Sequence, residues 1–277
     1  MTQTLKQKLD KFYRDYDFKG RIANDPIELP HLFTRPEDVE VSGFIAACFS
    51  YGKVELFKPV IKSLLHRMGH SPYDFLLNHN ICENRELFAG LRYRFNSNDD
   101  ILCLFHVLGS LIRKYGSVES VFRRHYRSSD TSIEAGLAGM TEVFLGVDTS
   151  VIYGDAAKPK GFLQFFPSPA RGSACKRMNM FLRWMIRDRD IDFGIWRGFP
   201  KNKLVIPLDV HIARISRCLG FTSRASQDWK TAIEITESLK TIDAEDPLKY
   251  DFALCHQGIA RICSSKRCDE CNFKLGI

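Results

Sequence analysis

Two residues of opposite charge, Lys176 and Asp209, have the types and settings that a covalent reaction through an amine requires. Lys176 follows a loop with two prolines and a glycine, and it lies in the predicted first turn of a long helix whose predicted N-cap is Ser173. The helix N-terminus and the neighbouring cation of Arg177 both favour the neutral, nucleophilic amine. Such an amine can form a Schiff base, and a carboxylate can stabilise the resulting cation and transfer protons.

Asp209 precedes a predicted amphipathic helix that ends at Gly220. An apolar run, residues 204–208, leads into it and is interrupted by Pro207. An aspartate in this place is a good N-cap, because its carboxylate accepts hydrogen bonds from the first free amides at the positive end of the helix. Capping alone would account for Asp209, so a catalytic role needs support from the residues around it.

The residues around Asp209 provide a resemblance to a known family. The string resembles a segment of the helix-hairpin-helix base-excision DNA glycosylases that reads Val-Asp-Thr-His-(x)-x-Arg-Val. Pro207, Asp209, His211 and Arg214 agree with it in order, and Gly220 follows. In that family the aspartate is the catalytic carboxylate, and its match here is Asp209.

A second match surrounds Lys176. The hairpin of the family reads Leu-Pro-Gly-Val-Gly-Arg-Lys-x-x-Asn; its backbone amides bind a DNA phosphate, and in bifunctional members its lysine is the nucleophile. Lys176 and Asn179 match Lys-x-x-Asn, and Pro167 matches the hairpin proline. The two hairpin glycines are absent, with Gly172 alone nearby. The resemblance implies that Lys176 attacks C1′ of a damaged nucleotide and expels the base, after which β-elimination can cut the strand.

The resemblance also implies contacts with DNA from two loops and a pocket for the extruded base. The family inserts a glutamine from a Ser-x-Gln-x turn into the duplex, and residues 50–53 fall at that turn. Gly52 replaces the glutamine, so the wedge is Tyr51 or Lys53, unless this is a plain interhelical turn. The other candidate DNA-binding residues are Arg171, Gly172, Ser173 and Arg177. The candidate pocket residues, each of them also a candidate for the core, are Trp184, Phe252 and His256.

The interval between Lys176 and Asp209 bears on the substrate. A segment rich in charged and aromatic residues, 187–203, makes this interval longer than in endonuclease III. The archaeal 8-oxoguanine glycosylase branch has a similarly long interval. The resemblance therefore favours an oxidised purine such as 8-oxoguanine as the damaged base.

Cysteines near the end of the chain correspond to part of a metal site. Endonuclease III relatives hold an iron–sulfur cluster with four cysteines, and Cys263, Cys268 and Cys271 match three of them. No fourth cysteine follows, and only Cys255 could replace it. Because a four-thiolate site needs all its ligands, we expect no bound metal and no cofactor.

The composition is that of an ordinary globular protein. The chain has 277 residues, of which 44% are hydrophobic and 26% charged, and a formal net charge of +7. This charge suits a polyanionic partner without requiring one. No apolar run reaches the length of a membrane helix, and the first residues lack the apolar core of a signal peptide. Nine cysteines, several of them within apolar helices, suit a reducing compartment. We expect a cytoplasmic protein.

Apolar periodicity predicts an all-α protein. The expected helices span residues 5–16, 38–50, 54–68, 101–115, 133–144, 173–187, 210–219 and 227–239. The resemblance implies a two-domain helix-hairpin-helix glycosylase fold with a central cleft. Residues 41–187 would form a helical barrel that ends with the Lys176 helix, and residues 1–40 with 188–277 would form the domain that carries Asp209.

The function expected from these matches is that of a bifunctional DNA glycosylase with lyase activity at apurinic or apyrimidinic sites. It would act as a monomer on duplex DNA that contains a damaged base, through Lys176 and Asp209. A monofunctional glycosylase, in which Lys176 does no chemistry, is one alternative. A non-catalytic DNA- or RNA-binding protein on the same fold is the alternative from another class. The absence of the two hairpin glycines favours this last alternative, whereas the presence of both Lys176 and Asp209 opposes it.

Overall fold

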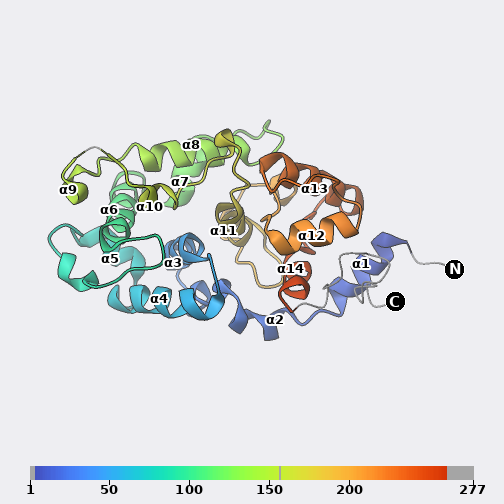
Figure 1. Ribbon diagram of the computed structural model, residues 1–277, viewed down its shortest axis with the longest axis horizontal. Helices are drawn as coiled ribbons and strands as arrows, with labels where there is room; N and C mark the ends of the chain where they lie inside the picture. The colour runs from blue at the N-terminus through green and yellow to red at the C-terminus, as the bar shows by residue number, and fades with distance from the viewer. Residues whose placement is uncertain (1–3, 156, 261–277) are drawn as a thin grey trace. The chain divides into compact units, whose positions relative to one another are not determined.

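The fold is all-α, as the sequence predicts. A computed structural model describes residues 4–155 and 157–260 (Figure 1). In these residues there is no β-strand, and β-type pairing is limited to two isolated bridges, Tyr93 with Asn96 and Ser173 with Asp228. No helix in this part of the chain combines the length and the apolar character that crossing a membrane requires.

The chain divides into two compact units. The middle unit is Ala23–Ser168, and the terminal unit combines Met1–Ile22 with Pro169–Ile277. The sequence placed these boundaries further along the chain, after residues 40 and 187. The helix that begins at Lys176 therefore belongs to the terminal unit, together with Asp209.

The middle unit is built from helices with apolar, mostly buried faces. Its α-helices are α3 (Pro36–Phe49), α4 (Val54–Arg67), α5 (Pro72–Asn78), α6 (Asn98–Tyr115), α7 (Val118–Arg123), α8 (Glu134–Leu145), α9 (Ser150–Tyr153) and α10 (Lys160–Leu163). Its 3-10 helices are Pro26–Glu28, Pro30–Leu32 and Arg85–Phe88. Buried aromatic rings join its elements: Phe44 of α3 lies 5.1 Å from Phe144 of α8, and Phe49 lies 5.2 Å from Phe165, measured between ring centroids.

Local sequence sets the ends of α6. Ser97 and Asp100 form a capping box, in which the Ser97 hydroxyl accepts from the Asp100 amide and the Asp100 carboxylate accepts from the Ser97 amide. At the other end Gly116 has a positive φ of 85°, a conformation that glycine adopts with little strain. The predicted stop at Gly116 is thus confirmed.

The terminal unit contains the residues for which chemistry is predicted. Its α-helices are α1 (Leu5–Arg14), α2 (Phe18–Arg21), α11 (Lys176–Ile186), α12 (Val210–Cys218), α13 (Trp229–Ile242) and α14 (Asp251–Ile259). Its 3-10 helices are Pro169–Arg171 and Lys201–Lys203, and a third, Ile22–Asn24, spans the boundary between the units. Helices α12 and α14 contact each other (Figure 1).

Arg183 on α11 is buried between two carboxylates. Its Nη1 lies 2.5 Å from Oδ2 of Asp251, the first residue of α14, and its Nε lies 3.2 Å from Oδ1 of Asp192. A buried charge is tolerated when it is paired and hydrogen-bonded. Burial raises the pKa of Asp251 to about 6, although the Arg183 guanidinium acts in the opposite direction. This contact ties the Lys176 helix to α14.

Arg187, one turn further on, is buried in the same way. Its Nε lies 3.0 Å from Asp246, its Nη1 3.0 Å from Asp192 and its Nη2 2.7 Å from Asp190. Burial opposes the charge of Arg187, but these carboxylates outweigh it and raise the pKa of the guanidinium. Asp192 therefore bridges the two arginines, and α11 belongs to the terminal unit because its charges are neutralised there.

Replacement of Arg187 tests this account of the terminal unit. Arg187→Met leaves buried carboxylates without their partner, so we expect the free energy of unfolding to fall by about 3–5 kcal/mol in urea denaturation. Arg189→Met is the matched control, because the Arg189 side chain is 66% exposed and lies 4.0 Å from Asp188. Its effect should stay within about 0.5 kcal/mol. Equal losses in the two variants would contradict the account.

Candidate active site

Lys176 is the first residue of α11, which confirms its predicted place in the first turn. The predicted N-cap is wrong, however: the N-cap position is Cys175, whose backbone is left-handed with φ 48° and ψ 34°. Ser173 acts within the preceding loop instead, where its hydroxyl accepts a hydrogen bond of 3.2 Å from the Cys175 amide. A left-handed conformation costs a non-glycine residue about 1–2 kcal/mol, so contacts around the loop must stabilise it.

Two contacts hold the loop in front of Lys176. The Asn179 side chain, which is fully buried, donates to the Ala174 carbonyl at 3.1 Å. The Trp229 amide, at the start of α13, donates to the Gly172 carbonyl at 3.1 Å. The asparagine of the Lys-x-x-Asn match therefore has a structural role, because it connects α11 back to the loop and so directs the start of the helix.

Asp209 caps α12, as predicted, and uses one carboxylate oxygen to do so. Its Oδ1 accepts hydrogen bonds from the amides of His211 at 2.8 Å and Ile212 at 2.9 Å. Its Oδ2 faces α11 and lies 3.4 Å from the Nζ of Lys176. The two oxygens thus have separate partners, one in the helix and the other in the candidate site.

The structure brings together the two residues for which catalysis was predicted. The Lys176 side chain is 36% exposed and that of Asp209 is 15% exposed, so the amine is accessible while the carboxylate is largely shielded. Their separation exceeds the roughly 2.7–2.9 Å of a direct charge-assisted hydrogen bond. The contact between Lys176 and Asp209 is therefore a loose ion pair rather than a tight hydrogen bond.

A third reactive group, the thiol of Cys255, lies at the same carboxylate oxygen. Its Sγ donates to Asp209 Oδ2 at 3.6 Å. Cys255 comes from α14, which approaches α12 so closely that a Cβ on Gly258 would lie 2.5 Å from the Cβ of His211. Sequence reasoning considered Cys255 only as a replacement metal ligand. Gly258, a glycine within the helix, was the available signal of this close approach.

Metal ligation is not supported among the residues that the structure describes. No group of three or more histidine, cysteine, aspartate or glutamate residues in residues 4–155 and 157–260 could hold a metal ion. Cys263, Cys268 and Cys271 lie outside the described residues. The absence of metal therefore stays a prediction.

The candidate DNA-binding residues near Lys176 all belong to its loop and first turn. Arg171 and Gly172 are exposed, whereas Ser173 and Arg177 are half-buried. Gly172 has a positive φ of 77°. The loop therefore has two left-handed residues, at 172 and 175, although only one of them is glycine.

The candidate wedge residues belong to the middle unit, and Tyr51 is less accessible there than the sequence suggested. Its hydroxyl donates to the Tyr93 carbonyl at 3.0 Å and contacts the Asn96 side chain. Lys53 is exposed and precedes α4. Gly52 is also exposed, with a φ of 89°, and a Cβ there would lie 2.6 Å from an Arg94 nitrogen. A wedge role for Tyr51 or Lys53 stays a prediction.

Sequence reasoning missed one exposed aromatic residue beside this turn. Phe95 is 66% exposed, and its ring is stacked on that of Tyr51 with centroids 6.3 Å apart. It lies in the tight turn between Tyr93 and Asn96, where Arg94 has a positive φ of 49°. The exposure of this ring could not be seen in the sequence.

The three candidate base-pocket residues are all buried in the terminal unit. Trp184 is fully buried, and Phe252 and His256 are 5% and 7% exposed, with ring centroids 4.2 Å apart. A pocket of about 280 Å³ in the same unit has other lining residues, and neither Lys176 nor Asp209 is among them. Where an extruded base would lie is therefore still a prediction.

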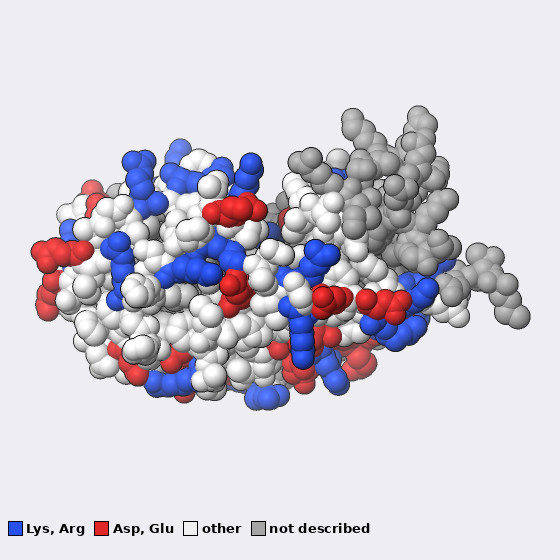
Figure 2. Space-filling model, turned by 90° about the horizontal axis from the view of Figure 1, so that it is seen from below, with Lys and Arg blue, Asp and Glu red and all other residues white. Residues whose placement is uncertain are grey.

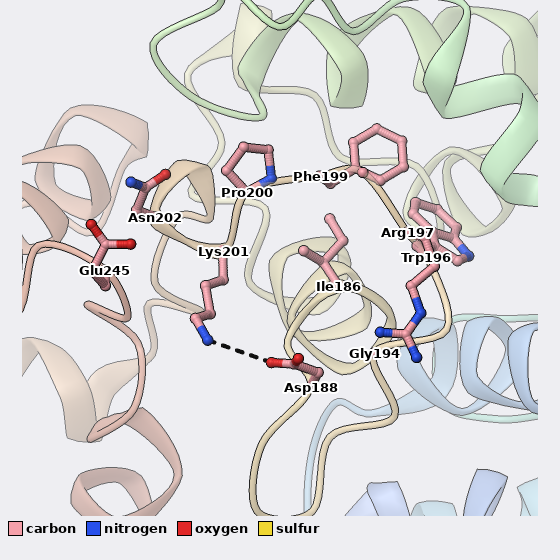
Figure 3. Close-up of a pocket in the computed structure, with 11 residues that line it drawn as sticks. Ile186, Asp188, Gly194, Trp196, Arg197, Phe199, Pro200, Lys201, Asn202 and Glu245 are labelled. Atoms are coloured by element: carbon pink, nitrogen blue, oxygen red, sulfur yellow. Dashed lines mark hydrogen bonds and ion pairs between the residues drawn. The ribbon is translucent and has the colours of Figure 1, made fainter.

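That pocket lies between the segment after α11 and Glu245 (Figure 3). Trp196 and Phe199 provide apolar walls, and Lys201 points toward Asp188, with Nζ 3.4 Å from Oδ1. Lys201 and Asp188 of this pocket are thus paired with each other. Lys201 and Lys176 have the same separation from their carboxylates, which makes Lys201 a useful control for Lys176.

Variants of Asp209 separate its capping role from its charge. Asp209→Ala should lower the free energy of unfolding by about 1 kcal/mol, and Asp209→Asn by less, because asparagine caps a helix about as well as aspartate. Asp228→Ala is the reference: it removes the side chain that accepts from the Thr231 amide at the start of α13, and it should resemble Asp209→Ala. Urea denaturation measures all three. A loss in Asp209→Asn as large as in Asp209→Ala would contradict the capping account.

Comparison with known proteins gives a family. The family model described as "Protein of unknown function (DUF2400)" matches residues 25–260, which include Lys176, Asp209 and Cys255. No curated protein and no solved structure matches the chain. Because the family model covers most of its length, the chain belongs to the DUF2400 family.

Proposed function

We propose that the protein is a bifunctional DNA glycosylase with lyase activity at apurinic or apyrimidinic sites. Its substrate would be duplex DNA that contains a damaged base, an oxidised purine such as 8-oxoguanine. The observation that carries the proposal is the 3.4 Å contact between Lys176 Nζ and Asp209 Oδ2. Two segments of sequence resemble the glycosylases independently, and their reactive residues meet in the folded chain.

In the proposed reaction Lys176 is the nucleophile. Its neutral amine attacks C1′, a carbon–nitrogen bond forms to the sugar, and the glycosidic bond breaks with its electron pair leaving on the base. Asp209 Oδ2 stabilises the positive charge of the sugar and accepts the proton that the amine gives up. The C1′–O4′ bond of the ring then breaks, O4′ takes that proton, and the C1′–N bond becomes the imine of the Schiff base. Oδ1 remains bonded to the α12 amides during these steps, which keeps the carboxylate at the start of α12.

The proposal includes the helix-hairpin-helix glycosylase architecture with its central DNA-binding cleft. Pro169–Arg171 and the loop that follows would replace the hairpin. Two left-handed residues, Gly172 and Cys175, support this role, since a hairpin that presents its amides to a phosphate needs a sharply turning backbone. The exposed Arg171 beside them supplies positive charge.

One observation favours the monofunctional alternative. A carboxylate close to an amine stabilises the charged ammonium form, which cannot attack. If the contact between Asp209 and Lys176 persists in the complex with DNA, Asp209 would activate a water molecule for the attack. Lys176 would then only help to position that water molecule. Covalent trapping distinguishes the two reactions.

Borohydride trapping tests the Schiff base. Wild-type protein should become covalently attached to a duplex that contains 8-oxoguanine, because borohydride reduces the imine between Lys176 and C1′. Lys176→Gln should abolish the trapped complex. Lys201→Gln should retain it, since Lys201 is also paired with a carboxylate at 3.4 Å in the same unit but lies away from Asp209. A denaturing gel measures the attached protein.

The remaining outcomes decide between the alternatives. Asp209→Asn should slow base release by orders of magnitude, because it removes the charge that stabilises the sugar cation. Base release without trapping in the wild type would favour the monofunctional reaction. Trapping in Lys176→Gln would place the nucleophile elsewhere. Neither release nor trapping on any oxidised purine, despite DNA binding, would favour the non-catalytic alternative.

Binding to duplex DNA should depend steeply on salt, because neutralisation of phosphates releases counterions. Lysine and arginine side chains are spread over the face seen in Figure 2, with acidic side chains between them, so specific contacts rather than net charge should set the slope. Arg171→Ala should reduce the slope of log affinity against log salt by about 1. Arg189→Met should leave it unchanged. Fluorescence anisotropy measures both, and binding that does not respond to salt would contradict the proposed partner.

A further inference from the structure

The thiol of Cys255 and the amine of Lys176 converge on one oxygen. Asp209 Oδ2 lies 3.6 Å from Cys255 Sγ and 3.4 Å from Lys176 Nζ. Cys255 is half-buried. The carboxylate therefore has an uncharged donor on α14 as well as a charged partner on α11, both at the oxygen opposite the one that caps α12.

The scaffold sets the position of Cys255. Asp251, one turn before it on α14, is paired with the buried Arg183 of α11 at 2.5 Å. One turn after it, Gly258 lies against His211 of α12, where a Cβ would be only 2.5 Å from the His211 Cβ. The segment that carries Cys255 is thus attached on both sides to the helices that carry Lys176 and Asp209.

Rotation about the Cβ–Cγ bond of Asp209 moves both carboxylate oxygens together. The two α12 amides restrain this rotation through Oδ1, and Lys176 and Cys255 restrain it through Oδ2. Once Lys176 has left for the sugar, the thiol still acts on Oδ2. A thiol is a weak donor, so it can orient the carboxylate while neutralising its charge less than a cation would.

We propose that Cys255 is a positioning residue of this site, which holds Asp209 Oδ2 in place after Lys176 has moved to the substrate. The inference rests on the proposed function. It does not require oxidation of the thiol or a bound metal, and Cys255 itself does not react. Its effect is transmitted entirely through Asp209.

Single-turnover base release tests the role. Cys255→Ala should reduce the rate constant about tenfold, the effect of one hydrogen bond to a charged group. Its affinity for the lesion duplex and its Tm should stay close to those of the wild type. Cys255→Ser should recover most of the rate, because a hydroxyl also donates. Cys218→Ala, another half-buried cysteine and one on the Asp209 helix, should match the wild type.

A double variant tests whether the effect passes through Asp209. Cys255→Ala combined with Asp209→Asn should release the base no more slowly than Asp209→Asn alone, because the donor has lost the charge that it positions. Multiplied losses in the double variant would overturn the proposal. A Cys255→Ala protein with the wild-type rate, or one whose loss is matched by its Tm and not rescued by serine, would overturn it as well.

Thiol alkylation tests the contact without any activity. Next to a carboxylate, a thiolate forms less readily, so in Asp209→Asn the reaction of Cys255 with iodoacetamide should be several-fold faster than in the wild type. The reaction of Cys218, measured on its own peptide by mass spectrometry, should not change. An unchanged rate at Cys255 would contradict the contact. If the wild type releases no base, the proposed function fails and the alkylation result alone decides whether Cys255 holds Asp209.

Discussion

Two buried guanidinium groups, one in the last turn of α11 and one directly after its end, determine how the terminal unit is assembled. Arg183 and Arg187 lie one turn apart, and they share Asp192 while each takes further carboxylates from remote segments. An unpaired charge in such a place would cost several kcal/mol, so the helix has a single acceptable rotation about its axis. That rotation determines the direction in which Lys176, at the start of the same helix, presents its amine.

Much of this fold is local and could be predicted. The helices follow from apolar periodicity, and the starts and stops of α6 and α12 follow from the residues at their ends, because caps act over three or four positions. Asp209 was identified both as a cap and as a candidate carboxylate from its neighbours in sequence. The sequence could not reveal that Asp209 uses a different carboxylate oxygen for each of these two roles.

The missed features depend on segments far apart in the chain. Arg183 and Arg187 are buried, and two of the carboxylates that neutralise them, Asp251 and Asp246, come from segments far along the chain. The cap predicted at Ser173 failed because a hydrogen bond from Trp229 helps to hold the loop in a conformation that local preference disfavours. The place of Cys255 depends on how α12 and α14 are aligned along each other. The close approach of Gly258 to His211 sets this alignment, and the apolar periodicity of the sequence does not predict it.

Because one oxygen of Asp209 caps α12 and the other faces Lys176, the reactivity of the site depends on the local stability of α12. Helix ends open more readily than the protein unfolds as a whole. When the first turn of α12 opens, Oδ1 loses its amides and Oδ2 loses its fixed position beside Lys176 at the same moment. The site is therefore assembled only in molecules whose first turn of α12 is intact, so it should fail on warming before the helices around it melt.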